Sequence, residues 1–118
     1  MKAQARWLLV LICAAGVALG GCAAWQGARL YQSGTRALEA GDAATALTDL
    51  REAARLVPDA SEVQNHLGLA WLANGDEVRA KASFERALEL DCDNEAARVN
   101  LEQVEASPSP TAASSARE

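Results

Sequence analysis

Hydrophobic residues recur along most of the chain at the three- and four-residue spacing of helices that bury one side. Short segments that contain glycine, aspartate, asparagine or proline separate these stretches. The pattern predicts five helices, at about residues 27–40, 43–56, 61–73, 77–90 and 94–106. A sheet is not expected, because β-branched and aromatic residues, which favour strands, are scarce.

The pattern repeats after 34 residues, when residues 27–60 are aligned with residues 61–94. Eight aligned pairs are identical: Gly34/Gly68, Leu38/Leu72, Gly41/Gly75, Asp42/Asp76, Ala46/Ala80, Ala53/Ala87, Leu56/Leu90 and Asp59/Asp93. We expect the glycines and alanines inside helices to let partner helices approach closely. The glycines between helices suit a left-handed helix end, and the aspartates after them suit helix caps.

Larger residues are expected to fill the space between the helices, and these are Leu50, Leu67, Trp71 and Phe84. Ser61 and Gln64 have the spacing of a capping box at the start of the third predicted helix. In the last predicted helix, the apolar positions are expected to cover the second repeat while the glutamates face water. The apolar positions are Val99, Leu101 and Val104, and the glutamates are Glu95, Glu102 and Glu105.

The stretch from Leu67 to Asp91, with Gly68, Trp71 and Phe84 in their order, resembles a tetratricopeptide repeat, a helix–turn–helix unit of this period. The first repeat ends in Pro58, the usual stop. The resemblance implies an all-α fold, a short α-α solenoid of two such hairpins plus a C-terminal capping helix at 95–106. Each repeat buries its apolar face only against its neighbours. We therefore expect the first repeat to pack against a partner, against a second copy in a homodimer, or against a membrane surface.

In folds of this kind the first helices of successive repeats line a concave groove, which implies a site for a protein or peptide partner. The expected lining residues are Tyr31, Gln32, Thr35, Leu38, Glu39, Glu62, Asn65, His66, Leu69, Leu72, Val99, Asn100 and Gln103. Amide side chains there can donate to and accept from a peptide backbone at once. The alternative is that this face is an ordinary solvent-exposed surface, on which Leu38, Leu69 and Leu72 are partly packed.

The start of the chain has the organisation of a secretory signal. Lys2 and Arg6 precede an uncharged apolar run, Trp7 to Leu19, which is too short to span a bilayer comfortably. The following Leu19-Gly20-Gly21-Cys22 resembles the lipobox of bacterial lipoproteins. The resemblance implies that Cys22 becomes the lipidated first residue of the mature protein. An ordinary cleaved signal peptide and an uncleaved anchor helix are the alternatives.

These features divide the chain into a signal peptide (1–21), a lipidated tether (22–28), a repeat domain (29–106) and a polar, proline-containing tail (107–118) that is expected to be disordered. The resemblance places the mature protein in the bacterial cell envelope, facing the periplasm. Ala23, where an inner-membrane retention signal would have Asp, favours the outer membrane.

Composition limits the chemistry. The net charge of −5 argues against nucleic-acid binding, which needs clustered Lys and Arg. One histidine and three cysteines leave little room for a metal site, and we expect no metal or cofactor. His66 and Cys92 make an imaginable dyad, but Cys92 is expected in a turn, away from His66. Cys92 is either a small apolar residue in that turn or one of the two cysteines of an intermolecular disulfide.

The sequence therefore predicts no enzyme. It predicts a membrane-anchored adaptor that binds a protein partner during envelope complex assembly, in settings such as pilus or secretion-system biogenesis. The alternative is a structural periplasmic scaffold, or a self-associating lipoprotein, linked to cell-wall machinery.

Overall fold

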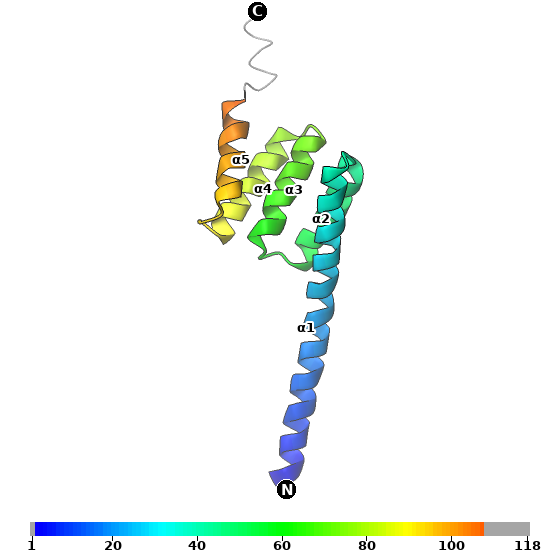
Figure 1. Cartoon of the computed structure of the whole chain (residues 1–118). Coiled ribbons are helices and arrows are strands. Elements are labelled where there is room, and N and C mark those ends of the chain that lie inside the picture. The colour runs from blue at the N-terminus through cyan, green and yellow to red at the C-terminus, as the bar shows by residue number, and fades with distance from the viewer. Residues whose placement is uncertain (1, 108–118) are drawn as a thin grey trace, which may run out of the picture.

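The computed structural model describes the backbone of residues 2–107 and the side chains of residues 21–107. The helices are α1 (Lys2–Glu39), α2 (Ala43–Leu56), α3 (Ser61–Ala73), α4 (Glu77–Leu90) and α5 (Glu95–Ala106). Two helical hairpins, α1–α2 and α3–α4, stand side by side, and α5 packs on the second (Figure 1). The all-α fold with two hairpins and a terminal helix is thus confirmed over the described residues.

The predicted bounds of α2, α3 and α4 agree with the structure, and α5 begins one residue later than expected. The expectation for α1 was wrong, because that helix begins at Lys2 rather than near residue 27. Residues 2–26 contain no proline and are rich in alanine and leucine, which are strong helix formers. Cys22 and the predicted tether are therefore helical. Residues 108–118 of the predicted tail lie outside the described residues.

A thin core holds the hairpins together. Leu50 and Phe84 are its largest fully buried side chains, and buried alanines surround them. A Cβ atom added at Gly34 would lie 2.6 Å from Leu50 Cγ, and one at Gly68 would lie 2.7 Å from Phe84 Cδ1. The predicted role of the helical glycines is confirmed, because the partner side chain occupies the space where their own would stand.

The turns inside both hairpins follow the predicted design. Gly41 and Gly75 have φ angles of +77° and +80°, which place them in the left-handed region. The carboxylate of Asp42 accepts from the Thr45 N–H at 3.1 Å, and that of Asp76 accepts from the Arg79 N–H at 2.9 Å. Each glycine thus ends one helix, and the next residue caps the following helix.

The predicted capping box at the start of α3 is wrong. Ala60 is the N-cap there, and no side chain caps that end. The Ser61 hydroxyl instead donates to the Ala87 carbonyl at 2.9 Å and accepts from Asn94 Nδ2 at 2.7 Å. Asn94 Oδ1 in turn accepts from the Ala97 N–H at 3.0 Å and caps α5. Ser61 faces α4 and α5, so its hydroxyl joins three helices rather than capping its own.

The packing of α5 differs in part from the expectation. Val99, which we expected to cover the second repeat, is 39% exposed, and the small Ala97 is the fully buried residue of this helix. Leu101 and Val104 are half-buried, as expected. Glu105 was expected only to face water, but its carboxylate pairs with Lys81 Nζ of α4 at 2.7 Å. The small Ala97, rather than Val99, therefore occupies the buried position of α5.

Candidate binding face

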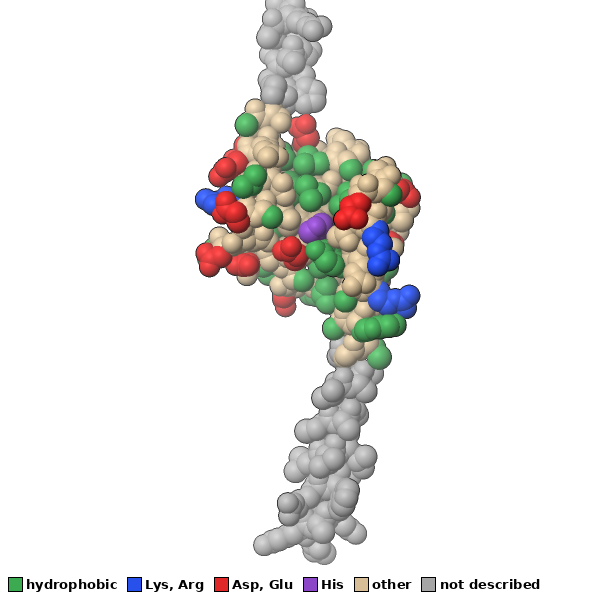
Figure 2. All heavy atoms as spheres, in the orientation of Figure 1, with side chains coloured by type: hydrophobic (Ala, Val, Ile, Leu, Met, Phe, Trp, Pro, Cys, Tyr) green, Lys and Arg blue, Asp and Glu red, His purple; other side chains and the backbone are tan. Residues whose placement is uncertain are grey.

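The predicted binding residues come from α1, α3 and α5. We call the surface that they form the α1–α3–α5 face, defined by Tyr31, His66, Leu69, Val99 and Asn100. Figure 2 shows the single histidine near the middle of this surface, with hydrophobic and acidic side chains around it. The first helices of both hairpins and the terminal helix therefore contribute to one surface.

Tyr31 and His66 join α1 to α3 at the centre of this face. The Tyr31 hydroxyl lies 3.2 Å from His66 Nδ1, and the two rings meet edge to face with centroids 5.1 Å apart. Nδ1 also lies 3.0 Å from the Glu62 carbonyl oxygen. When Nδ1 carries a proton it donates to that carbonyl, and when it does not it accepts from Tyr31. Desolvation by burial, and secondly the charge of Glu62, raises the pKa of Tyr31.

Next to the Tyr31–His66 pair, two amide side chains join α3 to α5. Asn100 Nδ2 donates to Asn65 Oδ1 at 2.9 Å. Asn65 is only 2% exposed, so its amide serves the contact between helices. Asn100 is half-buried and is the more accessible amide of the two. The pairing adds a structural role to a position that the sequence singled out for peptide contact.

The remaining predicted residues surround these two pairs. Gln32, Glu39, Glu62 and Gln103 are exposed, and Leu38, Leu69 and Leu72 are half-buried. Thr35 is half-buried, and its hydroxyl donates to the Gln32 carbonyl at 3.0 Å. The face thus has a partly apolar centre and a rim with two carboxylates, an arrangement that suits a protein segment with apolar and basic side chains.

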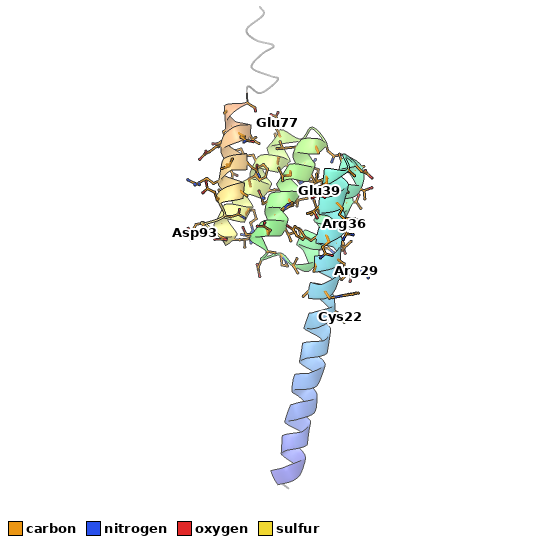
Figure 3. The ribbon with its side chains drawn as sticks, in the orientation of Figure 1. Cys22, Arg29, Arg36, Glu39, Glu77 and Asp93 are labelled. Carbon is orange, nitrogen blue, oxygen red and sulfur yellow. The ribbon has the colours of Figure 1, made fainter. Side chains whose placement is uncertain are left out.

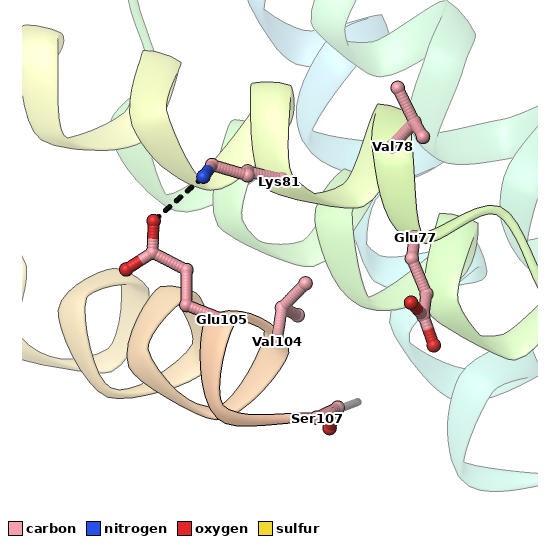
Figure 4. Close-up of a pocket in the computed structure, with 6 residues that line it drawn as sticks. All are labelled: Glu77, Val78, Lys81, Val104, Glu105 and Ser107. Carbon is pink, nitrogen blue, oxygen red and sulfur yellow. Dashed lines mark ion pairs between the residues drawn. The ribbon is translucent and has the colours of Figure 1, made fainter. Parts of the chain in front are cut away.

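Surface hollows lie elsewhere on the molecule. One of about 380 Å³ lies between α4 and α5 and is lined by Glu77, Val78, Lys81, Val104, Glu105 and Ser107 (Figure 4). Lys81 and Glu105 lie 34 residues after Leu47 and Trp71, two side chains that pack against the core between the hairpins. Between α4 and α5, the ion pair therefore stands at the repeat positions that apolar side chains occupy between the two hairpins. The sequence analysis did not identify this ion pair, although Lys81 and Glu105 lie at the repeat positions of Leu47 and Trp71.

Sequence reasoning also missed the surroundings of Trp71. The guanidinium of Arg79 lies 4.9 Å from the centre of its ring, and that of Arg51 lies 5.8 Å from it. Trp71 is half-buried, so one side of the indole packs on the core while arginines from α2 and α4 cover it. Only the assembled fold brings these three side chains together.

The groups considered for other chemistry do not gather. Among the described residues, no three side chains of His, Cys, Asp or Glu cluster as metal ligands would. Cys92 lies exposed in the turn between α4 and α5, where the sequence predicted it. His66 lies on α3 and contacts Tyr31 and the Glu62 carbonyl.

Comparison with known proteins agrees with this architecture. No family model matches the chain. The chain is 47% identical over 68 residues to a TPR repeat-containing protein of Pseudomonas aeruginosa, an alignment that covers 58% of this chain and 28% of the relative. It is 42% identical over 59 residues to heat shock protein STI1 of Saccharomyces cerevisiae, covering 50% of this chain and 10% of that protein.

The chain therefore spans less than a third of the length of either relative. The 34-residue period, the two hairpins with glycine opposite a large side chain, and the similarity to a TPR repeat-containing protein lead to one conclusion. Over the described residues, the chain is a short all-α solenoid that resembles tetratricopeptide-repeat proteins.

Proposed function

We propose that this chain is a membrane-anchored adaptor that binds a segment of another protein on its α1–α3–α5 face. The observation that carries the proposal is the composition of that face. Three helices supply a partly apolar centre, which two hydrogen-bonded pairs hold in place, and an acidic rim. The similarity to a TPR repeat-containing protein supports a role in protein binding. The proposed role is non-catalytic.

The anchor is a lipidated Cys22. Its side chain is exposed on α1, and Cys22 is the last residue of the stretch that resembles a lipobox. Each buried CH₂ of an acyl chain contributes about 0.8 kcal/mol, so two or three chains hold a protein durably. The proposed location is the periplasmic side of a bacterial envelope, with the outer membrane favoured by Ala23. Pilus or secretion-system biogenesis is the proposed setting.

The helical tether makes the attachment short. The first buried residue of α1 after Cys22 is Gly27, which faces Val57 of the α2–α3 turn. At a rise of about 1.5 Å per residue, five residues of helix span only about 8 Å. The repeat domain is therefore held against the membrane, where its binding face meets neighbouring envelope proteins.

A matched pair of valine variants tests the adaptor function. Val99→Asp places a charge on the α1–α3–α5 face, whereas Val78→Asp places the same charge on α4, where Val78 is 82% exposed. The full chain is expressed in bacteria and solubilised with its partners after cross-linking. Val99→Asp is expected to lose the cross-linked partner, and Val78→Asp is expected to keep it. Equal yields from both variants would contradict the adaptor proposal, and an unacylated Cys22 in the mass spectrum would contradict the anchor.

The same pair tests the alternative of a self-associating scaffold linked to cell-wall machinery. The observation that favours this alternative is the exposed Val78 beside Val104 at the α4–α5 hollow. If a homodimer forms there, Val78→Asp lowers the sedimentation mass of the detergent-solubilised chain, and Val99→Asp leaves it unchanged.

A further inference from the structure

One side of α1 carries a stripe of exposed residues that faces away from the core. Cys22, Trp25, Arg29 and Arg36 are all exposed, and Trp25 is 65% exposed. Because successive helical residues turn by about 100°, these positions lie within about 60° of one another around the helix. Figure 3 shows Cys22, Arg29 and Arg36 along α1. We call these four residues the anchor stripe.

The charge along the chain changes sign just beyond the stripe. Arg29 and Arg36 are the only charged residues between Cys22 and Leu38, and the first acidic residue is Glu39. From Glu39 onward the chain carries 16 acidic and 7 basic residues. Among residues 21–107, neither Arg29 nor Arg36 forms an ion pair. The side of the molecule next to the proposed lipid is therefore basic, while the bulk of the domain is acidic.

The stripe has the side chains that suit a phospholipid headgroup region. The Arg29 guanidinium lies 4.9 Å from the centre of the Trp25 ring. Tryptophan favours the membrane interface, and arginine binds phosphate through paired hydrogen bonds. A hollow of about 310 Å³ opens here, lined by Trp25, Gln26, Arg29, Leu30, Ser33 and Asp49. Asp49 of α2 is the acidic group at its edge, and the rest of the lining is neutral or basic.

We propose that the acylated protein lies on its side, with the anchor stripe against a bilayer that carries anionic phospholipids. This inference rests on the proposed lipidation of Cys22. Arg36 is 14 residues from Cys22, so an upright α1 would hold it about 21 Å above the anchor. That distance exceeds the screening length of about 8 Å at physiological salt, so an upright α1 would leave Arg36 outside the field of the lipids. Lying down brings both arginines to the headgroups and turns the acidic bulk away from them.

Two label positions distinguish the lying from the upright orientation. Ser33 and Ala28 are both exposed, but they lie about 140° apart around α1, and Ala28 is the closer to Cys22 along the helix. The acylated full chain, in a Cys92→Ser background with Ser33→Cys or Ala28→Cys, is spin-labelled and placed in vesicles of equal parts phosphatidylcholine and phosphatidylglycerol. Collision with lipid-soluble oxygen, against a water-soluble nickel complex, reports lipid contact. We expect lipid contact at residue 33 to exceed that at residue 28, and the reverse order would overturn the proposal.

A pair of charge variants tests the role of the arginines. A basic residue near an anionic surface favours contact about fivefold, so Arg29→Gln with Arg36→Gln is expected to lower the ratio of lying to upright protein about 25-fold. The matched control is Arg86→Gln with Arg98→Gln, two exposed arginines on α4 and α5, which should leave the label at residue 33 in contact with lipid. Circular dichroism verifies equal helix content in all variants. An equal loss in both pairs would overturn the proposal.

Other outcomes separate this inference from the function on which it rests. If mass spectrometry finds Cys22 without acyl chains, the proposed anchor fails and the inference fails with it. If Cys22 is acylated but residue 28 has the greater lipid contact, only the inference fails. If the label at residue 33 is shielded from both oxygen and nickel, also in vesicles of phosphatidylcholine alone, a second protein copy covers the stripe, which overturns the proposal of a lipid surface.

Discussion

Gly34 and Gly68 show how single residues set the distance between helices. The space for their missing side chains is filled by Leu50 and Phe84 from the second helix of each hairpin. Both glycines were predicted from their 34-residue spacing, because close approach of two helices requires a small residue at the contact. The same reasoning identified Ala46 and Ala80, which are fully buried.

Gly68→Ala is expected to destabilise the protein. The new methyl group would lie 2.7 Å from Phe84 Cδ1 and closer still to Cε1, and overpacking of a well-packed core costs about 1–3 kcal/mol. Urea unfolding followed by circular dichroism measures the free energy of unfolding. Ser33→Ala changes an exposed helical position and serves as the control, with an expected change within about 0.5 kcal/mol. A Gly68→Ala protein as stable as this control would show that α3 and α4 do not pack as described.

At the scale of the helices, local signals determined most boundaries. The caps at Asp42 and Asp76 and the left-handed Gly41 and Gly75 are properties of a few neighbouring residues, which sequence spacing captures. Ser61 shows the limit of such signals. Its partners, Ala87 and Asn94, lie 26 and 33 residues away, so only the assembled fold places its hydroxyl between three helices.

Ser61→Ala is expected to loosen α5 from the second hairpin. The change leaves Asn94 Nδ2 without its acceptor, at a cost of about 1–3 kcal/mol in the free energy of unfolding, whereas the Ala87 carbonyl keeps the Asp91 N–H as a donor. Combined with Asn94→Ala in a double-mutant cycle, it should give a coupling energy of about 0.5–3 kcal/mol. Purely additive effects in urea unfolding would mean that the two side chains do not interact.

The cap of α2 is expected to respond to acid. Hydrogen bonds from Thr45 lower the pKa of Asp42 below its ordinary value of 3.8. Because the pKa is lower in the folded state, the stabilisation is fully present above pH 3.8 and is lost as the pH falls through the folded value. Asp42→Asn removes this titration. The variant's free energy of unfolding should therefore fall less between pH 4 and pH 2 than that of the unchanged chain, and parallel curves would rule out the contribution.

For the whole molecule, the repeat period predicted which helices form the binding face. It did not predict how the side chains of these helices pack against one another. The buried Asn65 has its amide partner in Asn100, 35 residues later on α5. The sequence analysis also did not predict the polar character of the surface at the end of the helix stack. Lys81 and Glu105 occupy the positions of Leu47 and Trp71, and their ion pair gives the terminal surface a polar character.

Restoring the interior residues at that end is expected to make the protein self-associate. Lys81→Leu with Glu105→Trp would reproduce the apolar pair found between the hairpins, at a hollow where Val78 and Val104 already lie. Sedimentation of the detergent-solubilised chain should then show a mass that rises with protein concentration. Lys81→Glu with Glu105→Lys keeps the charges and is expected to sediment like the unchanged chain. A double variant to Leu and Trp that remains unchanged in mass would show that this pair does not end the stack.

We propose that the α1–α3–α5 face binds a protein partner. The most direct measurement is photo-cross-linking in living bacteria, with a photoreactive amino acid in place of Leu69 on this face or in place of Val78 on α4. We expect a discrete protein adduct from position 69 and none from position 78. Adducts from position 78 alone, or equal adducts from both, would contradict it.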